Sequence, residues 1–160
     1  MEILRTAALD DIDGAPVGQL ERDARTTNAE LAAGAGVAPS TSHARVRALE
    51  SRGVLAGYHA SVDQAALGRG LQAIIGVTLR PGSRQESIVA FAENVRRLPQ
   101  VIQSFFVGGA DDFLVHVAVE DSSALRTMVV EHISGQPTVA STRTSVIFAY
   151  QRNAVAAEFD

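Results

Sequence analysis

The second half of the chain alternates between strand-like and helix-like segments, and the order of these segments constrains the fold most. Helical spacing of apolar residues is found over 85–98 and after Ser122, which we expect to be the N-cap of its helix. The order strand, helix, strand, strand, helix, strand predicts a ferredoxin-like β-α-β-β-α-β domain, so the fold class is α+β. Branched and apolar residues typical of strands occupy 71–79, 101–107, 112–119 and 139–150.

A sheet of this kind has helices on one face only. We expect four antiparallel strands, with both helices packed against the same side. The other side is left uncovered by the chain itself. An uncovered, partly apolar sheet face predicts pairing with another subunit.

The first half contains two short helices joined by a glycine turn. Asn28 is a good N-cap for the first helix, which Gly34 and Gly36 end. The second helix starts at Ala38 or Pro39, since proline is tolerated in a first turn, and it stops at Gly53. This arrangement is the helix-turn-helix pattern.

The second of these helices has two distinct faces. Ser42, Val46 and Leu49 recur at helical spacing and predict the inward face. Arg45 lies near the boundary between the faces. Helix pairs with glycine turns also occur in proteins that do not bind DNA, so the pattern alone leaves both readings open. The outward face carries Ser40, Thr41, His43, Ala44 and Arg47.

The segments on either side of this helix pair carry weaker signals. Residues 9–24 show an apolar helical stripe that Gly14 and Pro16 interrupt, so we expect a helix that starts late, with Asp13 as N-cap, and is short or bent at Pro16. Residues 54–63 predict one extended strand. Residues 64–70 predict a short helical turn closed by glycines.

Composition excludes several classes of function. The chain has no cysteine, which removes disulfides and thiolate chemistry. It has no apolar run of about 18 residues and no signal-peptide pattern, so we expect a cytoplasmic protein that does not span a membrane. A net charge of −4 counts mildly against DNA binding, but DNA responds to a local patch, and 38–52 has an excess of positive charge.

Five motifs follow one another along the chain: LDDID (9–13), NAELA (28–32), APSTSHARVRALESRGVLAGY (38–58), GGADDFLVHVAV (108–119) and TRTSVIF (142–148). No single motif is diagnostic, but five in this order and spacing are specific. With them the chain resembles the Lrp/AsnC (leucine-responsive, feast/famine) family of transcription regulators from Leu9 to about Arg152.

The resemblance implies a winged-type helix-turn-helix domain followed by a ligand-sensing domain. It implies double-stranded DNA as partner, homodimers often assembled into octamers, and a small effector, usually an amino acid, bound between dimers. Two departures are the interrupted first helix and Ser42, which stands where a more apolar residue is usual. The candidate DNA contacts that it implies are Ser40, Thr41, His43, Arg45 and Arg47.

The resemblance also implies an effector site around the loop over 108–112. Gly108 and Gly109 would bring backbone amides near a ligand carboxylate, and Asp112 could pair with an ammonium group. Positions on the last strand that tune the response are Thr144, Ser145 and Val146. On the residues alone, the same loop also reads as a plain hairpin turn.

Metal and catalytic sites are not expected. Asp111 and Asp112 offer fewer oxygen ligands than Mg²⁺ or Ca²⁺ needs, and His59, His116 and His132 show no ligand spacing. The resemblance supplies no catalytic residues, so we expect no enzyme and no cofactor other than the effector. The alternative to a regulator is a ligand-binding oligomer that has lost DNA binding.

The expected domains follow from these readings. Residues 1–53 form the DNA-binding domain, and 54–70 form a linking strand and turn. Residues 71–152 form the effector-binding and oligomerisation domain. A tail over 153–160 completes the chain.

Overall fold

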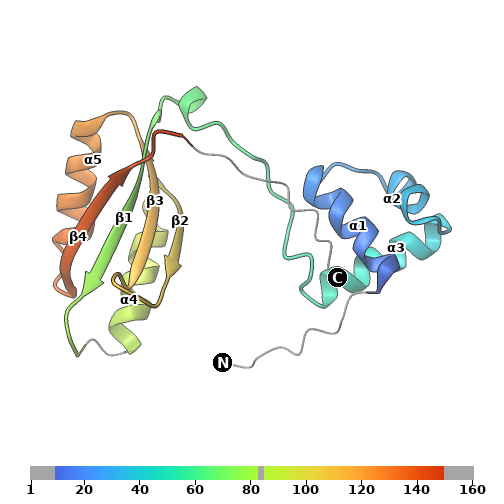
Figure 1. Cartoon of the computed structure of the whole chain (residues 1–160), viewed down its shortest axis with the longest axis horizontal. Helices are drawn as coiled ribbons and strands as arrows, with labels where there is room; N and C mark the ends of the chain where they lie inside the picture. The colour runs from blue at the N-terminus through green and yellow to red at the C-terminus, as the bar shows by residue number, and fades with distance from the viewer. Residues whose placement is uncertain (1–9, 83–84, 150–160) are drawn as a thin grey trace. The chain divides into compact units, whose positions relative to one another are not determined.

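The computed structural model describes residues 10–82 and 85–149 (Figure 1). These residues form two compact units, one ending at Ser61 and the other beginning at Val62. The division falls inside the expected connecting segment 54–70. The predicted tail over 153–160 lies outside the described residues.

The N-terminal unit consists of three helices. They are α1 (Asp11–Arg22), α2 (Asn28–Ala35) and α3 (Pro39–Ser51). The pair α2 and α3 confirms the predicted helix-turn-helix. Residues 10–61 contain no strand, so this part of the chain has helices but no wing strand.

The expectation of a first helix that starts late, with Asp13 as N-cap, was wrong. The helix α1 starts at Asp11 and continues through Pro16 to Arg22 without a break. Asp10 rather than Asp13 is the N-cap, because its side chain accepts a hydrogen bond of 2.7 Å from the Asp13 amide. Pro16 costs a helical hydrogen bond at its sixth position, but its ring is buried, and packing offsets the local preference.

The N-caps of two other helices lie one residue earlier than predicted. Thr27, not Asn28, caps α2, and Glu30 returns a hydrogen bond to the Thr27 amide at 2.7 Å, which forms a capping box. Asp121, not Ser122, caps the helix α5 (Ser122–Met128) by accepting from the Ala124 amide at 2.8 Å. Each pair of neighbours contains two good capping residues, so composition alone could not choose between them.

The strand predicted for 54–63 was also wrong. No residue of this segment pairs with another strand, and its backbone has no regular assignment. Branched residues favour an extended chain, but a strand also needs a hydrogen-bonding neighbour. The predicted turn follows as a 3₁₀ turn at Ala65–Leu67, closed by Gly68 in the left-handed region with φ of 75°.

The C-terminal unit confirms the predicted ferredoxin-like order. The antiparallel sheet has the strand order β2-β3-β1-β4, with β1 and β3 in the centre. The helix α5 continues into a π-helical turn, η2. The elements are β1 (Leu71–Leu79), α4 (Gln85–Arg96), β2 (Val101–Phe106), β3 (Phe113–Val119), α5 (Ser122–Met128), η2 (Val129–Ser134) and β4 (Val139–Val146).

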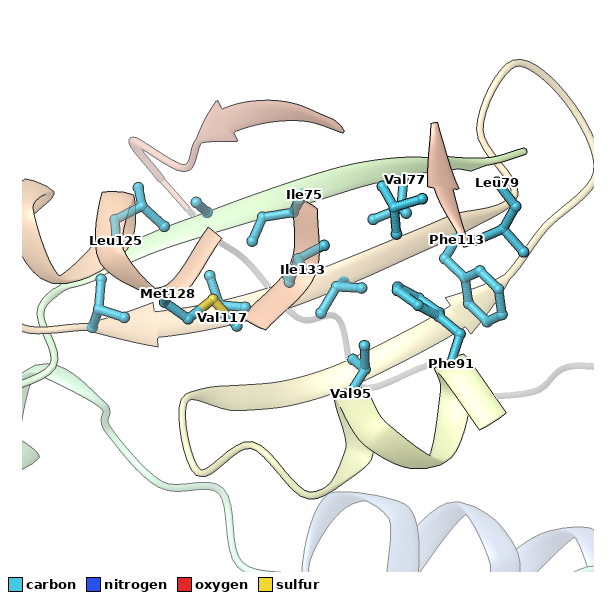
Figure 2. Close-up of a cluster of buried hydrophobic side chains, with 14 residues drawn as sticks. Ile75, Val77, Leu79, Phe91, Val95, Phe113, Val117, Leu125, Met128 and Ile133 are labelled. Atoms are coloured by element: carbon cyan, nitrogen blue, oxygen red, sulfur yellow. The ribbon is translucent and has the colours of Figure 1, made fainter. Parts of the chain in front are cut away.

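The core of this unit lies between the sheet and the helices (Figure 2). Every second residue of β1 from Ala73 to Leu79 and of β3 from Phe113 to Val119 is buried against the helices, as the two-residue period of a strand requires. In β3 the intervening His116 and Ala118 are buried as well. Phe91 from α4 packs against Phe113 of β3 with ring centroids 4.8 Å apart. Val95 of α4 and Ile133 of η2 complete the contact from the helix side.

The other face of the sheet carries no helix and is mixed in character. Ile74 and Leu114 are partly exposed there, and Phe105 is 46% exposed. The buried His116 lies between two glutamines: its Nε2 is 2.9 Å from Gln72 Oε1, and its Nδ1 is 3.4 Å from Gln103 Nε2. We call this side the open sheet face.

No helix among residues 10–82 and 85–149 is both long enough and apolar enough to cross a membrane.

Candidate DNA-binding and effector sites

The turn between α2 and α3 is fixed by local hydrogen bonds. Gly36 ends α2 in the left-handed region with φ of 65°, where a side chain would be strained. The Asn28 side chain donates a hydrogen bond of 2.8 Å to the Pro39 carbonyl at the start of α3. Asn28 therefore ties the two helices together, although it is not the N-cap that the sequence predicted.

The predicted division of α3 into two faces is observed. Ser42 and Leu49 are buried, and Leu49 is fully inaccessible. The Ser42 hydroxyl has no hydrogen-bond partner among the described residues. The exposed residues include four of the five candidate DNA contacts, which are Ser40, Thr41, His43 and Arg47.

The fifth candidate, Arg45, points toward α1. Its Nη1 lies 2.9 Å from Asp10 Oδ2 and 2.8 Å from Asp13 Oδ1. Arg52, one turn beyond Leu49, approaches the other oxygen of Asp13 at 3.3 Å. We call these four residues the α1–α3 ion cluster.

The cluster perturbs the acidity of its members. The hydrogen bond from Arg45 holds the pKa of Asp10 below its ordinary value, and the Asp13 amide adds to the effect. The bonds to Asp10 and Asp13 in turn raise the pKa of Arg45. The distances to Asp10 and Asp13 show that Arg45 is held by carboxylates of its own unit.

The loop between β2 and β3 contains the candidate effector residues Gly108, Gly109 and Asp112. Gly108 and Gly109 are exposed, and Gly109 has a φ of 148°. Asp112 is bound to β1 instead of pointing freely into solvent. Its amide donates to the Val77 carbonyl at 2.8 Å, and its Oδ2 accepts from the Leu79 amide at 2.7 Å.

Asp111 and Arg143 form an ion pair that the sequence analysis missed. Asp111 Oδ2 lies 2.6 Å from Arg143 Nη2, and the two side chains are 12% and 67% exposed. The carboxylate rests on Gly76 of β1, where an added Cβ would lie 2.8 Å from its atoms. Gly76 pairs with Arg143 across the β1–β4 ladder, but no local motif signals that these three residues meet.

The three predicted positions on β4 do not share one face. Thr144 pairs with Ile75 and Val146 pairs with Ala73, so both lie on the helix-covered side. Ser145 pairs with Ile74 and lies on the open sheet face with Arg143. Within one chain, the structure therefore does not gather all the predicted effector residues into one pocket.

A cavity of about 360 Å³ lies elsewhere in the C-terminal unit. None of the predicted effector residues lines it. The described residues contain no group of three or more acidic or histidine side chains that could hold a metal ion. The residues that line the cavity are Gln100, Asp121, Ser123, Ala124, Thr127, Met128 and His132.

Comparisons with known families match both units. The AsnC-type helix-turn-helix domain matches residues 9–50, and the Lrp/AsnC ligand binding domain matches residues 72–152. The chain is 44% identical over 151 residues to the HTH-type transcriptional regulator AldR of Mycolicibacterium smegmatis, covering 94% of this chain and 88% of that protein.

Solved structures give the same result. The crystal structure of AldR from Mycobacterium tuberculosis aligns with a TM-score of 0.74 and 38% identity, covering 92% of this chain and 99% of that one. A transcriptional regulator from Neisseria meningitidis, crystallised as a complex with L-Met, aligns with a TM-score of 0.82 and 27% identity. That alignment covers 91% of this chain and 94% of the other.

Proposed function

The chain belongs to the Lrp/AsnC family of DNA-binding transcription regulators with a ligand-binding domain, and we propose that it binds DNA through the outward face of α3. A regulator of this family is not an enzyme, as the sequence predicted. The observation that carries the proposal is the exposure of Ser40, Thr41, His43 and Arg47 on one side of a helix that follows a glycine turn. Such a helix fits the major groove.

Arg47 is the main cationic contact in this proposal. An arginine that neutralises a phosphate releases counterions, so its loss reduces the dependence of affinity on salt. We expect Arg47→Ala to weaken binding to the DNA upstream of the protein's own gene and to lower the salt slope by about one. Fluorescence anisotropy over a salt series measures both quantities.

The alternative is a ligand-binding oligomer that has lost DNA binding. The acidic net charge of −4 favours it. The exposed face of α3 favours the regulator, because a helix that no longer bound DNA could bury its outer side against another part of its own unit. Absence of any mobility shift at low salt, with a folded oligomeric protein, would establish the alternative.

We propose that the effector is an amino acid bound at the loop over 108–112. Asp111 and Arg143 together carry the two charges that complement an α-ammonium and an α-carboxylate. The exposed amides of Gly108 and Gly109 add donors for a carboxylate. Ser145 on the open sheet face, with Thr144 and Val146 on the other side of β4, adjoins the same region and tunes the response.

Asp111 and Asp112 are separable by experiment. Calorimetry with a panel of amino acids identifies the ligand for the wild-type protein. Asp111→Asn is expected to weaken binding at least tenfold, because it removes the charge that meets the ammonium group. Asp112→Asn tests the residue that the sequence favoured. If Asp111→Asn binds the ligand as the wild type does and Asp112→Asn does not bind it, then Asp112 is the residue that pairs with the ammonium group.

We propose that the subunits form a homodimer through the open sheet face. Ile74, Leu114 and Phe105 supply partly exposed apolar surface there, which a second copy would cover. Phe105→Glu should dissociate the dimer in light scattering, whereas Val89→Glu, on the exposed side of α4, should not. Assembly of dimers into octamers would bring the effector loops together and shift the spacing of the DNA-binding units.

A regulator of this kind acts where the chromosome lies. We therefore propose a cytoplasmic location.

A further inference from the structure

Arg45 and Arg47 lie two residues apart on α3 but face different environments. Arg47 is exposed, whereas the Arg45 side chain is only 29% exposed. Ser42, Arg45, Leu49 and Arg52 follow one another at helical spacing, and this stripe faces inward. The two arginines can therefore be compared directly, because the same residue type occurs on opposite sides of one helix.

Arg45 is held by two carboxylates at once. Its Nη1 lies 3.1 Å and 2.9 Å from the two oxygens of Asp10 and 2.8 Å from Asp13 Oδ1. Asp13 also receives Arg52 at 3.3 Å, and its side chain is 10% exposed. The Nη1 group of Arg45 is therefore occupied by two carboxylates, and a DNA phosphate could reach this side chain only through Nη2 or Nε unless it displaced them.

The carboxylates are themselves fixed by α1. Asp10 is the N-cap and accepts from the Asp13 amide, and Asp13 lies in the first turn. Negative charge at a helix N-terminus is favourable because of the helix dipole. The cluster therefore joins the start of α1 to the middle and end of α3.

Asn28 ties α3 to α2, but little else on the inner side of α3 fixes its orientation against α1. Leu49 is the only fully buried apolar residue in α3, and the buried Ser42 hydroxyl has no partner among the described residues. A single buried leucine gives α3 a small apolar contact, whereas hydrogen bonds from a guanidinium to two carboxylates define a direction. Precise placement matters because base contacts are sensitive to shifts of about 1 Å.

We propose that Arg45 is a positioning residue that orients α3 against α1 through Asp10 and Asp13, and that it does not contact DNA. This inference rests on the proposed DNA-binding function. It separates the basic residues of α3 into two roles. Arg47 meets the phosphate backbone, and Arg45, together with Arg52, holds the helix in place.

The first test compares Arg45→Ala with Arg47→Ala in the full-length protein. Arg45→Ala should lower the thermal midpoint of unfolding and weaken DNA binding at least fivefold, with the salt slope unchanged. Arg47→Ala should leave the midpoint unchanged and lower the salt slope by about one. A slope lowered by about one in Arg45→Ala, with an unchanged midpoint, would overturn the proposal.

The second test asks whether removal of a carboxylate charge strengthens or weakens DNA binding. Removing a negative charge near DNA should strengthen binding if only electrostatics matters. Positioning predicts the opposite, so Asp13→Asn should weaken binding several-fold at equal folded fraction. Asp10→Asn serves if Asp13→Asn fails to fold, because the Asp10 side chain is 56% exposed.

A protein in which Arg45 does not position α3 and a protein that does not bind DNA would give different results. Tighter DNA binding in either aspartate variant would refute the positioning role while leaving DNA binding by the wild type intact. A wild-type protein that binds no DNA at low salt would instead refute the proposed function. In that case the midpoint of Arg45→Ala still reports whether the cluster holds α1 and α3 together.

Discussion

In the C-terminal unit fourteen buried apolar side chains form one core between the sheet and its helices, whereas the N-terminal unit has a much smaller apolar interior. Among residues 10–61 the buried aliphatic side chains are Pro16, Leu20, Leu31, Ala32 and Leu49. The N-terminal unit adds the α1–α3 ion cluster and the Thr27 capping box.

The difference shows how each unit responds to its surroundings. Apolar burial depends little on ionic strength, so the sheet unit should keep its shape over a wide range of salt. Exposed and partly exposed ion pairs are screened by salt, and carboxylates lose their charge in acid. The pKa of Asp10 is lowered in the folded state, so its contribution is present above its ordinary pKa and is lost as the pH falls through the folded value.

The largest effect is expected from a substitution that disrupts the apolar core of the C-terminal unit. Phe91 is 1% exposed and packs on Phe113, so Phe91→Ala should destabilise the C-terminal unit by about 3–5 kcal/mol. Denaturant unfolding followed by circular dichroism measures this loss. Val89→Ala on the exposed side of α4 is the control and should cost less than about 1 kcal/mol. Equal losses for the two variants would contradict a core centred on Phe91.

A smaller effect is expected at the capping box of the N-terminal unit. Thr27→Ala removes the side chain that accepts from the Glu30 amide, and it should cost about 1 kcal/mol. Ser40→Ala removes an exposed hydroxyl near the start of α3 and should change stability little. Thermal unfolding of both variants measures the difference, and no loss in Thr27→Ala would show that the box is dispensable.

One substitution should stabilise the N-terminal unit. Ser42→Ala removes a buried hydroxyl without a partner among the described residues and introduces a better helix former, so a gain of about 0.5–1 kcal/mol is expected. Chemical denaturation at fixed salt measures it. A loss of stability would mean that the hydroxyl is satisfied in solution.

The smallest effect concerns the pH dependence of the C-terminal unit. Burial lowers the pKa of His116, and its hydrogen bonds with Gln72 and Gln103 suit a neutral ring. In the unfolded chain His116 takes up a proton below about pH 6.5, so stability should fall as the pH drops from there through the folded pKa. His116→Gln should reduce the loss between pH about 7.5 and about 5.5 by less than about 1 kcal/mol. An identical pH profile in the variant would exclude this role.

Sequence reasoning was most accurate where periodicity and packing agree. The limits of β1 were predicted as Leu71–Leu79 and observed there, because apolar and branched residues continue through the whole strand and its alternate residues are buried in the core. The helix α4 was predicted at 85–98 and ends at Arg96. The last strand was predicted to reach residue 150, but β4 ends at Val146.

Sequence reasoning failed where a local preference met a tertiary requirement. Pro16 disfavours a helix locally, yet α1 continues through it with the ring buried. Glu30, three residues after Thr27, was the signal that could have placed the N-cap of α2 correctly. The meeting of Gly76, Asp111 and Arg143 depends on strand register and had no such local signal.

The residue at position 76 controls the position of the effector loop from within the sheet. The Asp111 carboxylate can lie flat on β1 only because position 76 carries a hydrogen atom instead of a side chain. A methyl group at position 76 would displace Asp111, which lies 35 residues later in the sequence, without altering any charge. The loop and the middle of a central strand are therefore constrained together, and an engineer could retune ligand selectivity from the sheet side while leaving every loop residue as it is.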